Sequence, residues 1–154
     1  MLLVARLIHI FVGVFWAGTM IFNAWLLLPT LKDLGPDAGR VMGGLAKRGF
    51  LMIMPVSGIL TILSGAWLLW YASAGFDSAY MGSRPGIVYG LGMVLTITAF
   101  LIGILVVRTA VLKAAAATDP SVALHYRQRA AGAGTLVAVL ISVTIVCMAI
   151  GRYV

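Results

Sequence analysis

The chain has 154 residues, of which 62% are hydrophobic and 10% are charged, and its mean hydropathy is +1.10. This composition lies far outside that of soluble domains and inside that of polytopic membrane proteins. The formal charge of +7 does not indicate nucleic acid, because the basic residues stand between long apolar runs, where they orient a membrane protein and meet anionic lipid. We therefore expect the lipid bilayer as a partner and no nucleic acid.

Four apolar stretches are long enough to cross about 30 Å of hydrocarbon as helices. They cover approximately residues 3–28, 50–72, 86–112 and 130–151. These stretches predict an all-α integral membrane four-helix bundle that forms a single domain over residues 1–154. The first stretch is longer than the apolar part of a signal peptide, so we expect it to span the membrane.

Prolines and one aspartate predict where the helices begin and end. Pro29 is expected to end the first span. Asp119 can cap a helix that Pro120 begins and that runs on into the fourth span. The segment 37–49 between the first two spans is predicted to form a short surface helix.

The basic residues are distributed unequally between the two sides of the predicted bundle. Eight fall in the two loops of one side, namely Lys32, Arg40, Lys47, Arg48, Arg108, Lys113, Arg127 and Arg129, against Arg6, Arg84 and Arg152 on the other. The positive-inside rule then places both termini outside. We expect a multi-pass protein of the bacterial inner membrane with periplasmic termini. An aromatic belt is predicted near the outer ends of the spans, from Trp67, Trp70, Tyr71, Tyr80, Tyr89 and Tyr153.

Small residues recur at interfacial spacing on three of the predicted helices. They are Ser57, Thr61 and Gly65, then Gly92, Thr96, Ala99 and Gly103, then Ala131, Thr135, Ala138 and Ser142. Such stripes let helix backbones approach closely in lipid. They exceed what the internal interfaces obviously need, so we also expect a parallel homodimer.

Several kinds of chemistry are excluded by what the spans lack. All four acidic residues, Asp33, Asp37, Asp77 and Asp119, fall in loops or at helix ends, so no buried carboxylate relay or di-metal carboxylate cluster is expected. The lone Cys147 cannot form an intrachain disulfide. We therefore expect a functional site, if the spans hold one, in the first span.

One face of the first span carries nearly all of its unusual residues. His9, Gly13, Trp16, Met20 and Asn23 fall within roughly 40° of one another at helical spacing. Gly13 is expected to leave a gap between His9 and Trp16 that a flat group could enter. An ionisable side chain inside the membrane is a candidate functional residue because its burial is costly.

These residues outline a site for haem b. His9 would ligate the iron, Gly13 and Trp16 would shape the slot for the macrocycle, and Met93 or Met148 would be the second ligand. The propionates would meet the remaining outer cations, Arg6, Arg84 and Arg152. The alternative is that His9 only bonds to a carbonyl or a threonine of a neighbouring helix, or stays hydrated near the interface.

Two other groups of residues have simpler interpretations. His125 is expected to be a solvated residue on the basic side of the membrane. Met52 and Met54 form an M-x-M pair that could offer thioethers to Cu(I). However, residues i and i+2 point to different sides of a helix, so copper is the lesser alternative to haem.

The segments "LIHIFVGVFWAGTMIFNAWLLLP" and "SGILTILSGAWLLW" resemble the copper resistance D-like (CopD-like) small membrane proteins. They are more distantly similar to the four-helix bacterial protoporphyrinogen oxidases of the HemJ type. The shared features are His9, Trp16 and Gly18, Pro29, and a basic approach to the last helix in "HYRQRAAGAGTL". The resemblance implies that His9 is associated with haem b.

The sequence leaves three functions open. The leading one is a haem b membrane protein that passes electrons, or handles a small redox substrate, near the periplasmic face, with a redox partner in the periplasm or membrane. The second is a cofactor-free accessory or scaffold subunit of a larger membrane complex. The third is copper transport or HemJ-like porphyrinogen oxidation, and whether the chain is an enzyme stays open.

Overall fold

A computed structural model describes residues 1–154, except for the side chain of Pro36. The described residues form helices joined by short turns, and no strand, so the fold is all-α as predicted. The helices are α1 (Leu2–Phe22), η1 (Asn23–Leu27), α2 (Leu28–Asp33), η2 (Gly35–Asp37), α3 (Ala38–Lys47), α4 (Phe50–Ala72), α5 (Ser78–Met81), α6 (Arg84–Ile102), η3 (Gly103–Arg108), α7 (Thr109–Ala116) and α8 (Pro120–Ile150). Of these, η1 and η3 are π-helical and η2 is a 3₁₀ turn.

Four continuous helical segments are long and apolar enough to cross a membrane. They are Leu2–Asp33, Phe50–Ala72, Arg84–Ala116 and Pro120–Ile150. The predicted second span agrees with its helix at both ends, while the other three helices extend several residues beyond the predicted apolar cores. The extensions are amphipathic or polar turns, which carry a helix past the hydrocarbon without adding hydropathy.

The prediction that Pro29 ends the first helix is wrong. The π-helical segment η1 precedes it, in which the backbone N–H of Leu28 bonds to the carbonyl of Asn23, and the helix then continues as α2 to Asp33. In a regular α-helix the proline ring clashes with the carbonyl four residues earlier. The wider π turn displaces the carbonyls before Pro29 and so accommodates the ring.

The predicted start of the last helix at Asp119 and Pro120 is confirmed. The carboxylate of Asp119 accepts hydrogen bonds from the hydroxyl and the backbone N–H of Ser121, both at 2.7 Å. These bonds lower the pKa of Asp119 below its usual value. Because the pKa is lowered on folding, this cap stabilises the helix at neutral pH and loses its effect as the pH falls through that pKa.

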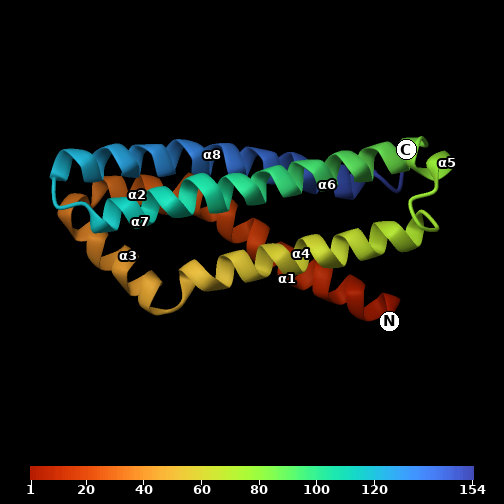
Figure 1. The fold of residues 1–154 in the computed structure, drawn as a ribbon, viewed down its shortest axis with the longest axis horizontal. Helices are drawn as coiled ribbons and strands as arrows, with labels where there is room; N and C mark the ends of the chain where they lie inside the picture. The colour runs from red at the N-terminus through yellow and green to blue at the C-terminus, as the bar shows by residue number, and fades with distance from the viewer.

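The bundle consists of two helix pairs (Figure 1). α1 packs on α4 and α6 packs on α8, and α1 and η1 also contact α8 and thereby join the pairs. In Figure 1, α6 and α8 run alongside each other, whereas α1 crosses α4. Both termini lie at one end of the bundle, and α2, α3 and α7 lie at the other. This arrangement puts the two basic loops on the same side, as the charge count requires.

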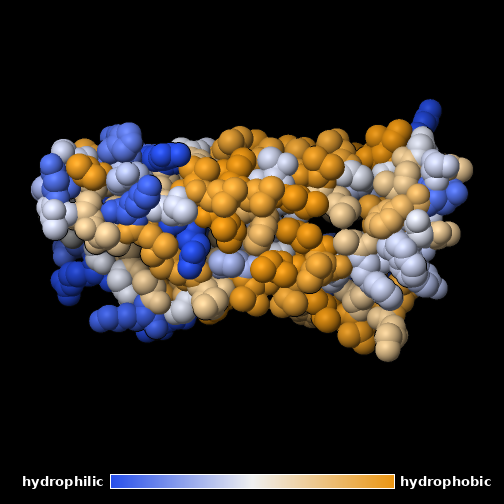
Figure 2. All heavy atoms as spheres, in the orientation of Figure 1, coloured by the Kyte–Doolittle hydropathy of each residue, from blue (hydrophilic) through white to orange (hydrophobic). Residues whose placement is uncertain are grey.

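The surface is that of a membrane protein. Figure 2 shows an apolar middle zone, with the hydrophilic side chains gathered at the end formed by α2, α3 and α7. Large hydrophobic side chains such as Phe11, Val14 and Leu105 are well exposed on the helices, which is stable only against lipid or another apolar protein surface. The surface helix predicted within 37–49 is α3, which buries none of its described residues.

The centre of the bundle is packed around Trp16. Its indole is 5% exposed and lies with Met54, Ala99, Val137 and Ile141 in one buried cluster. The ring of Phe100 on α6 packs at a tilt against it, with 6.3 Å between centroids. This cluster involves α1, α4, α6 and α8 together, so it connects the two helix pairs.

The predicted stripes of small residues mostly lie at helix interfaces. Ser57 and Thr61 on α4, Gly92 and Ala99 on α6, and Ala138 on α8 are buried. Two members of the stripes do not follow this pattern. Thr135 is exposed, and the position of a Cβ at Gly103 faces open space.

Gly58 allows the central aromatic pair to form, and its substitution should destabilise the bundle. A Cβ at Gly58 would stand 2.6 Å from a ring carbon of Phe100 and 3.2 Å from the indole of Trp16. We expect Gly58→Val to cost about 1–3 kcal/mol, as overpacking does, and to lower the melting temperature in detergent followed by circular dichroism. Gly18→Val is the matched control, because nothing lies within 4 Å of its Cβ position, and equal melting of the two variants would contradict this packing.

Candidate functional site

His9 packs against α4 through a hydrogen bond to the backbone. Its Nδ1 lies 3.0 Å from the carbonyl oxygen of Thr61 and 3.3 Å from the hydroxyl of Ser64. The imidazole is half-buried. One nitrogen is therefore engaged in the way the alternative interpretation of His9 requires.

The partners assign the tautomer of the neutral His9 ring. A carbonyl oxygen can only accept, so Nδ1 carries the proton and donates it to Thr61, and Nε2 keeps its lone pair. Nε2 bonds to no described residue, and it is not among buried unpaired polar atoms of the described chain. The ring thus presents an unprotonated nitrogen that is not fully buried, although it lies 3.6 Å from the position of a Cβ at Gly65. An unprotonated imidazole nitrogen is the form that binds metal ions.

Gly65 lets the His9 ring approach α4. A Cβ there would lie 2.7 Å from Cε1 of His9 and 3.2 Å from its Nδ1, so a larger residue would displace the ring. The hydroxyls of Thr61 and Ser64 donate to carbonyls of their own helix, at 2.8 Å for Ser57 and 2.6 Å for Leu60. Polar groups on this part of α4 are therefore satisfied without a ligand.

The gap that the sequence predicts at Gly13 is not open in this chain. A Cβ at Gly13 would stand 3.4 Å from the methyl group of Thr61, so α4 occupies the space on this face of α1. The physical reason is the crossing of α1 over α4, which brings the two backbones close where small residues face each other. A flat group next to His9 must therefore lie outside this helix contact.

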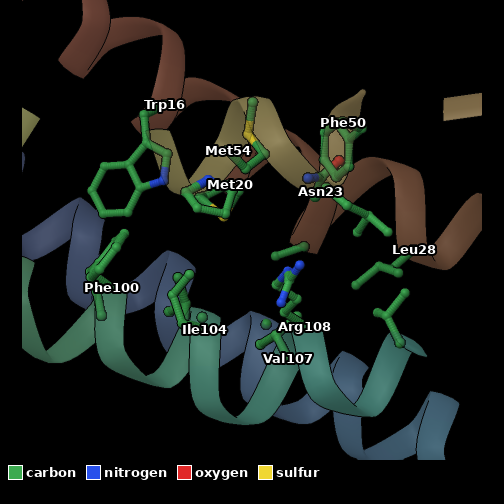
Figure 3. Close-up of a pocket in the computed structure, with 18 of the residues that line it drawn as sticks. Trp16, Met20, Asn23, Leu28, Phe50, Met54, Phe100, Ile104, Val107 and Arg108 are labelled. Carbon is green, nitrogen blue, oxygen red and sulfur yellow. The ribbon is translucent and has the colours of Figure 1, made fainter. Parts of the chain in front are cut away.

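Toward the basic end of the bundle, the same face of the first span lines a cavity instead. Trp16, Met20 and Asn23 face a space between α1, α4, α6 with η3, and α8 (Figure 3). His9 is not among the residues that line it. The one predicted face of α1 is thus divided between a helix contact near the termini and a cavity nearer the basic end.

The two candidate second ligands lie on the other helix pair. The methyl group of Met148 on α8 packs where a Cβ of Gly92 would stand, at 2.6 Å, and Met93 on α6 is half-buried. The hydroxyl of Thr144 donates to the carbonyls of Leu140 at 3.0 Å and Gly92 at 3.4 Å. The structure gives no contact that joins either methionine to His9, and Met148 has the packing of an ordinary core residue.

The three outer arginines are exposed at the end of the bundle that holds the termini. Arg152 lies over the ring of Tyr153, at 5.1 Å from its centroid, while Arg6 lies near the start of α1 and Arg84 begins α6. In the described part of the chain, the ion pair found is Arg40 with Asp37 at 3.4 Å. The three guanidinium groups are therefore available to anions at this end, although none contacts His9.

The positions of His125 and of the Met52–Met54 pair agree with the simpler interpretations of these residues. His125 is exposed and meets the ring of Tyr126 edge-on, with 5.6 Å between centroids. Met52 is exposed while Met54 is buried, so the M-x-M thioethers point to different sides. Within the described residues, no three His, Cys, Asp or Glu side chains form a metal-binding group.

The sequence predicts, as its alternative, a carbonyl of a neighbouring helix as the partner of His9 but not which one, and it does not place Arg108 at a cavity. The carbonyl of Thr61 carries no sequence signal, because any residue supplies a backbone carbonyl. Arg108 was assigned to a basic loop, yet it ends the π-helix η3 and lines the cavity. Its position inside the apolar run 86–112 was the available signal, since a cation there needs a reason.

Comparisons with family models, with curated proteins and with solved structures found no match to this chain. Function must therefore be argued from the site itself.

The tautomer of His9 is directly measurable. With uniformly ¹⁵N-labelled histidine, we expect His9 to show a single protonated Nδ1 and an unprotonated Nε2, because Thr61 fixes the proton. The exposed His125 should average between tautomers, and His125→Gln assigns the two sets of signals. Gly65→Val should abolish the fixed signal by displacing the ring, and a protonated Nε2 in the unmodified chain would contradict the assignment.

Proposed function

We propose that this chain is a haem b-binding membrane protein in which Nε2 of His9 would hold the iron. The observation that carries the proposal is the bond from Nδ1 to the Thr61 carbonyl at 3.0 Å, which leaves Nε2 unprotonated. Metal-ligating histidines commonly donate their other N–H to a backbone carbonyl, which fixes the ring and raises its basicity. The residues present therefore fit an axial imidazole.

Other residues at the same end of the bundle support the proposal. Arg6, Arg84 and Arg152 offer charge-assisted hydrogen bonds to two propionates. Met148 packs against Gly92 and Met93 lies on the other helix pair, so we propose no second ligand from these two methionines. When bound, haem b supplies one-electron chemistry, and we propose electron transfer or redox of a small substrate near this end with a membrane or periplasmic partner. The resemblance to CopD-like proteins is consistent with this role.

The closed contact at Gly13 bears on how a macrocycle would be enclosed. Because Thr61 fills that face of α1, haem held by His9 would not occupy the gap that the sequence predicts at Gly13. A second copy of the chain would then cover the haem, so we propose a parallel homodimer. Exposed apolar side chains such as Phe11 and Val14 on α1 are available for such an interface.

Loss and chemical rescue of the ligand test the haem proposal. Protein produced with full haem supply should show a Soret band and sharp reduced α and β bands. His9→Gly should lose at least about nine-tenths of this absorption, and added imidazole should restore it, because the cavity left by the side chain admits the free ligand. His125→Gly is the control and should keep the spectrum.

The same samples report on assembly. A detergent-corrected mass of two chains is expected for the haem-loaded protein. A flat visible spectrum in the unmodified protein, or a normal spectrum in His9→Gly, would remove haem ligation by His9. A mass of one chain at every dilution would remove the homodimer.

We propose the bacterial inner membrane as the location, with both termini periplasmic. The support is the excess of Lys and Arg in the two loops opposite the termini, which the positive-inside rule assigns to the cytoplasm. A C-terminal alkaline phosphatase fusion should be active, and a fusion after Arg48 should be inactive. Fluorescence from a C-terminal green fluorescent protein together with an inactive phosphatase fusion would invert the orientation.

A second candidate is a cofactor-free subunit of a larger membrane complex. The observation that favours it is the same pair of partners, because Thr61 and Ser64 satisfy Nδ1 of His9 without any metal. In that case Nε2 would bond to another subunit. We do not extend the proposal to copper, since Met52 and Met54 do not face a common site.

A further inference from the structure

A second site lies in the half of the bundle away from His9. The cavity between α1 with η1, α4, α6 with η3, and α8 has a volume of about 130 Å³. Its walls are mostly apolar and carry a few polar groups, which is the lining typical of ligand sites. Nothing in the haem proposal uses this cavity.

Three polar side chains stand on its apolar walls. They are the indole of Trp16, the amide of Asn23 and the guanidinium of Arg108. In Figure 3 the indole nitrogen is turned to the interior, and Arg108 reaches toward the middle from the opposite wall. No side-chain hydrogen bond or ion pair to another described residue is found for any of the three. The three side chains thus carry N–H donors that have no acceptor among the described residues.

Both π-helical segments border this cavity. Asn23 begins η1 and Arg108 ends η3, and Gly103, the first residue of η3, leaves open space at its Cβ position. A π turn inserts one residue and changes which side chains face inward, and such turns occur frequently at functional sites. Two of them on different helices present their polar ends to one space, so the cavity is not a simple packing defect.

The charge of the residues that line the cavity indicates which kind of ligand it can bind. None of the four aspartates lines the cavity, so Arg108 is a cation at an apolar site without a counter-ion in its walls. Arg108 is exposed, but it belongs to a helical segment apolar enough to span a membrane, where a cation away from water needs a partner. Its fork matches a carboxylate with two parallel hydrogen bonds. The rest of the lining, including Met20, Met54 and Phe100, suits a hydrocarbon body.

We propose that this cavity binds a single-chain carboxylate amphiphile of the fatty-acid type. Its carboxylate accepts hydrogen bonds from Arg108, with Asn23 as a second donor, and its apolar chain lies along Met20, Met54 and Phe100. One guanidinium neutralises one carboxylate, which favours the free acid over its neutral ester. The site is independent of His9.

The test uses cis-parinaric acid and its methyl ester as fluorescent probes. With the full chain in nanodiscs of zwitterionic lipid, we expect saturable binding of the acid, seen as energy transfer from tryptophan. The ester should bind at least about tenfold more weakly, as loss of a charge-assisted hydrogen bond predicts. This comparison needs no variant, so it holds even if a substitution harms folding.

Variants then locate the site. Arg108→Gln should weaken the acid to the level of the ester and leave the ester unchanged. Gly103→Phe should fill the cavity and abolish binding of both probes, whereas Gly18→Phe, which also has open space at its Cβ but does not line the cavity, should bind both normally. Circular dichroism and melting show that each variant is folded.

Two outcomes would overturn the proposal. Equal affinity for acid and ester in the unmodified protein would exclude recognition of a carboxylate by Arg108. Displacement of the acid by nanodiscs containing phosphatidylglycerol, at the lipid concentrations at which phosphatidylcholine has no effect, would identify the occupant as a two-chain anionic phospholipid instead.

Discussion

The whole structure depends on the absence of water from the hydrocarbon core, which obliges each backbone N–H and C=O group there to be satisfied within the chain. Helices satisfy this requirement locally, and the same rule extends to the side chains. Thr19, Thr96 and Ser142 each donate to the carbonyl four residues earlier in their own helix. Side chains that cannot do so are few, and among the described residues they are the ones that mark the candidate sites.

His9 and Arg108 solve this problem in different ways. His9 reaches across to a neighbouring helix and uses the carbonyl of Thr61, which satisfies one nitrogen and leaves the other free. Arg108 has no acidic partner within the described chain and points into a cavity. The first arrangement orients one nitrogen of an imidazole, and the second leaves a guanidinium without an anionic partner among the described residues. The two sites lie toward opposite ends of α1 and so can be tested separately.

The crossing of α1 over α4 explains why one face of α1 serves both places (Figure 1). Near the termini this face meets Gly65 and Thr61 and closes tightly. Beyond Trp16 it leaves α4 and faces α6 and α8 across the cavity. Trp16 stands at the division, packed on Phe100 and Gly58, and it holds the two helix pairs together while its N–H faces the open side.

Hydropathy alone determined the class of this protein, because only a long apolar run can replace the lost hydration of a membrane span, and the Asp119–Pro120 start of α8 followed from local capping chemistry. The unusual face of α1 was also readable from the spacing of His9, Trp16 and Asn23. The tertiary structure decided what that face meets. Three features depend on how the helices cross: the closed contact at Gly13, the Thr61 carbonyl that orients His9, and the cavity to which Arg108 belongs. The sequence does not predict them, because neither a backbone carbonyl nor a crossing angle is specified by a particular type of residue. Pro29 failed as a stop signal for a related reason, since the π turn before it is a change of hydrogen-bond register that the letters of the sequence do not record.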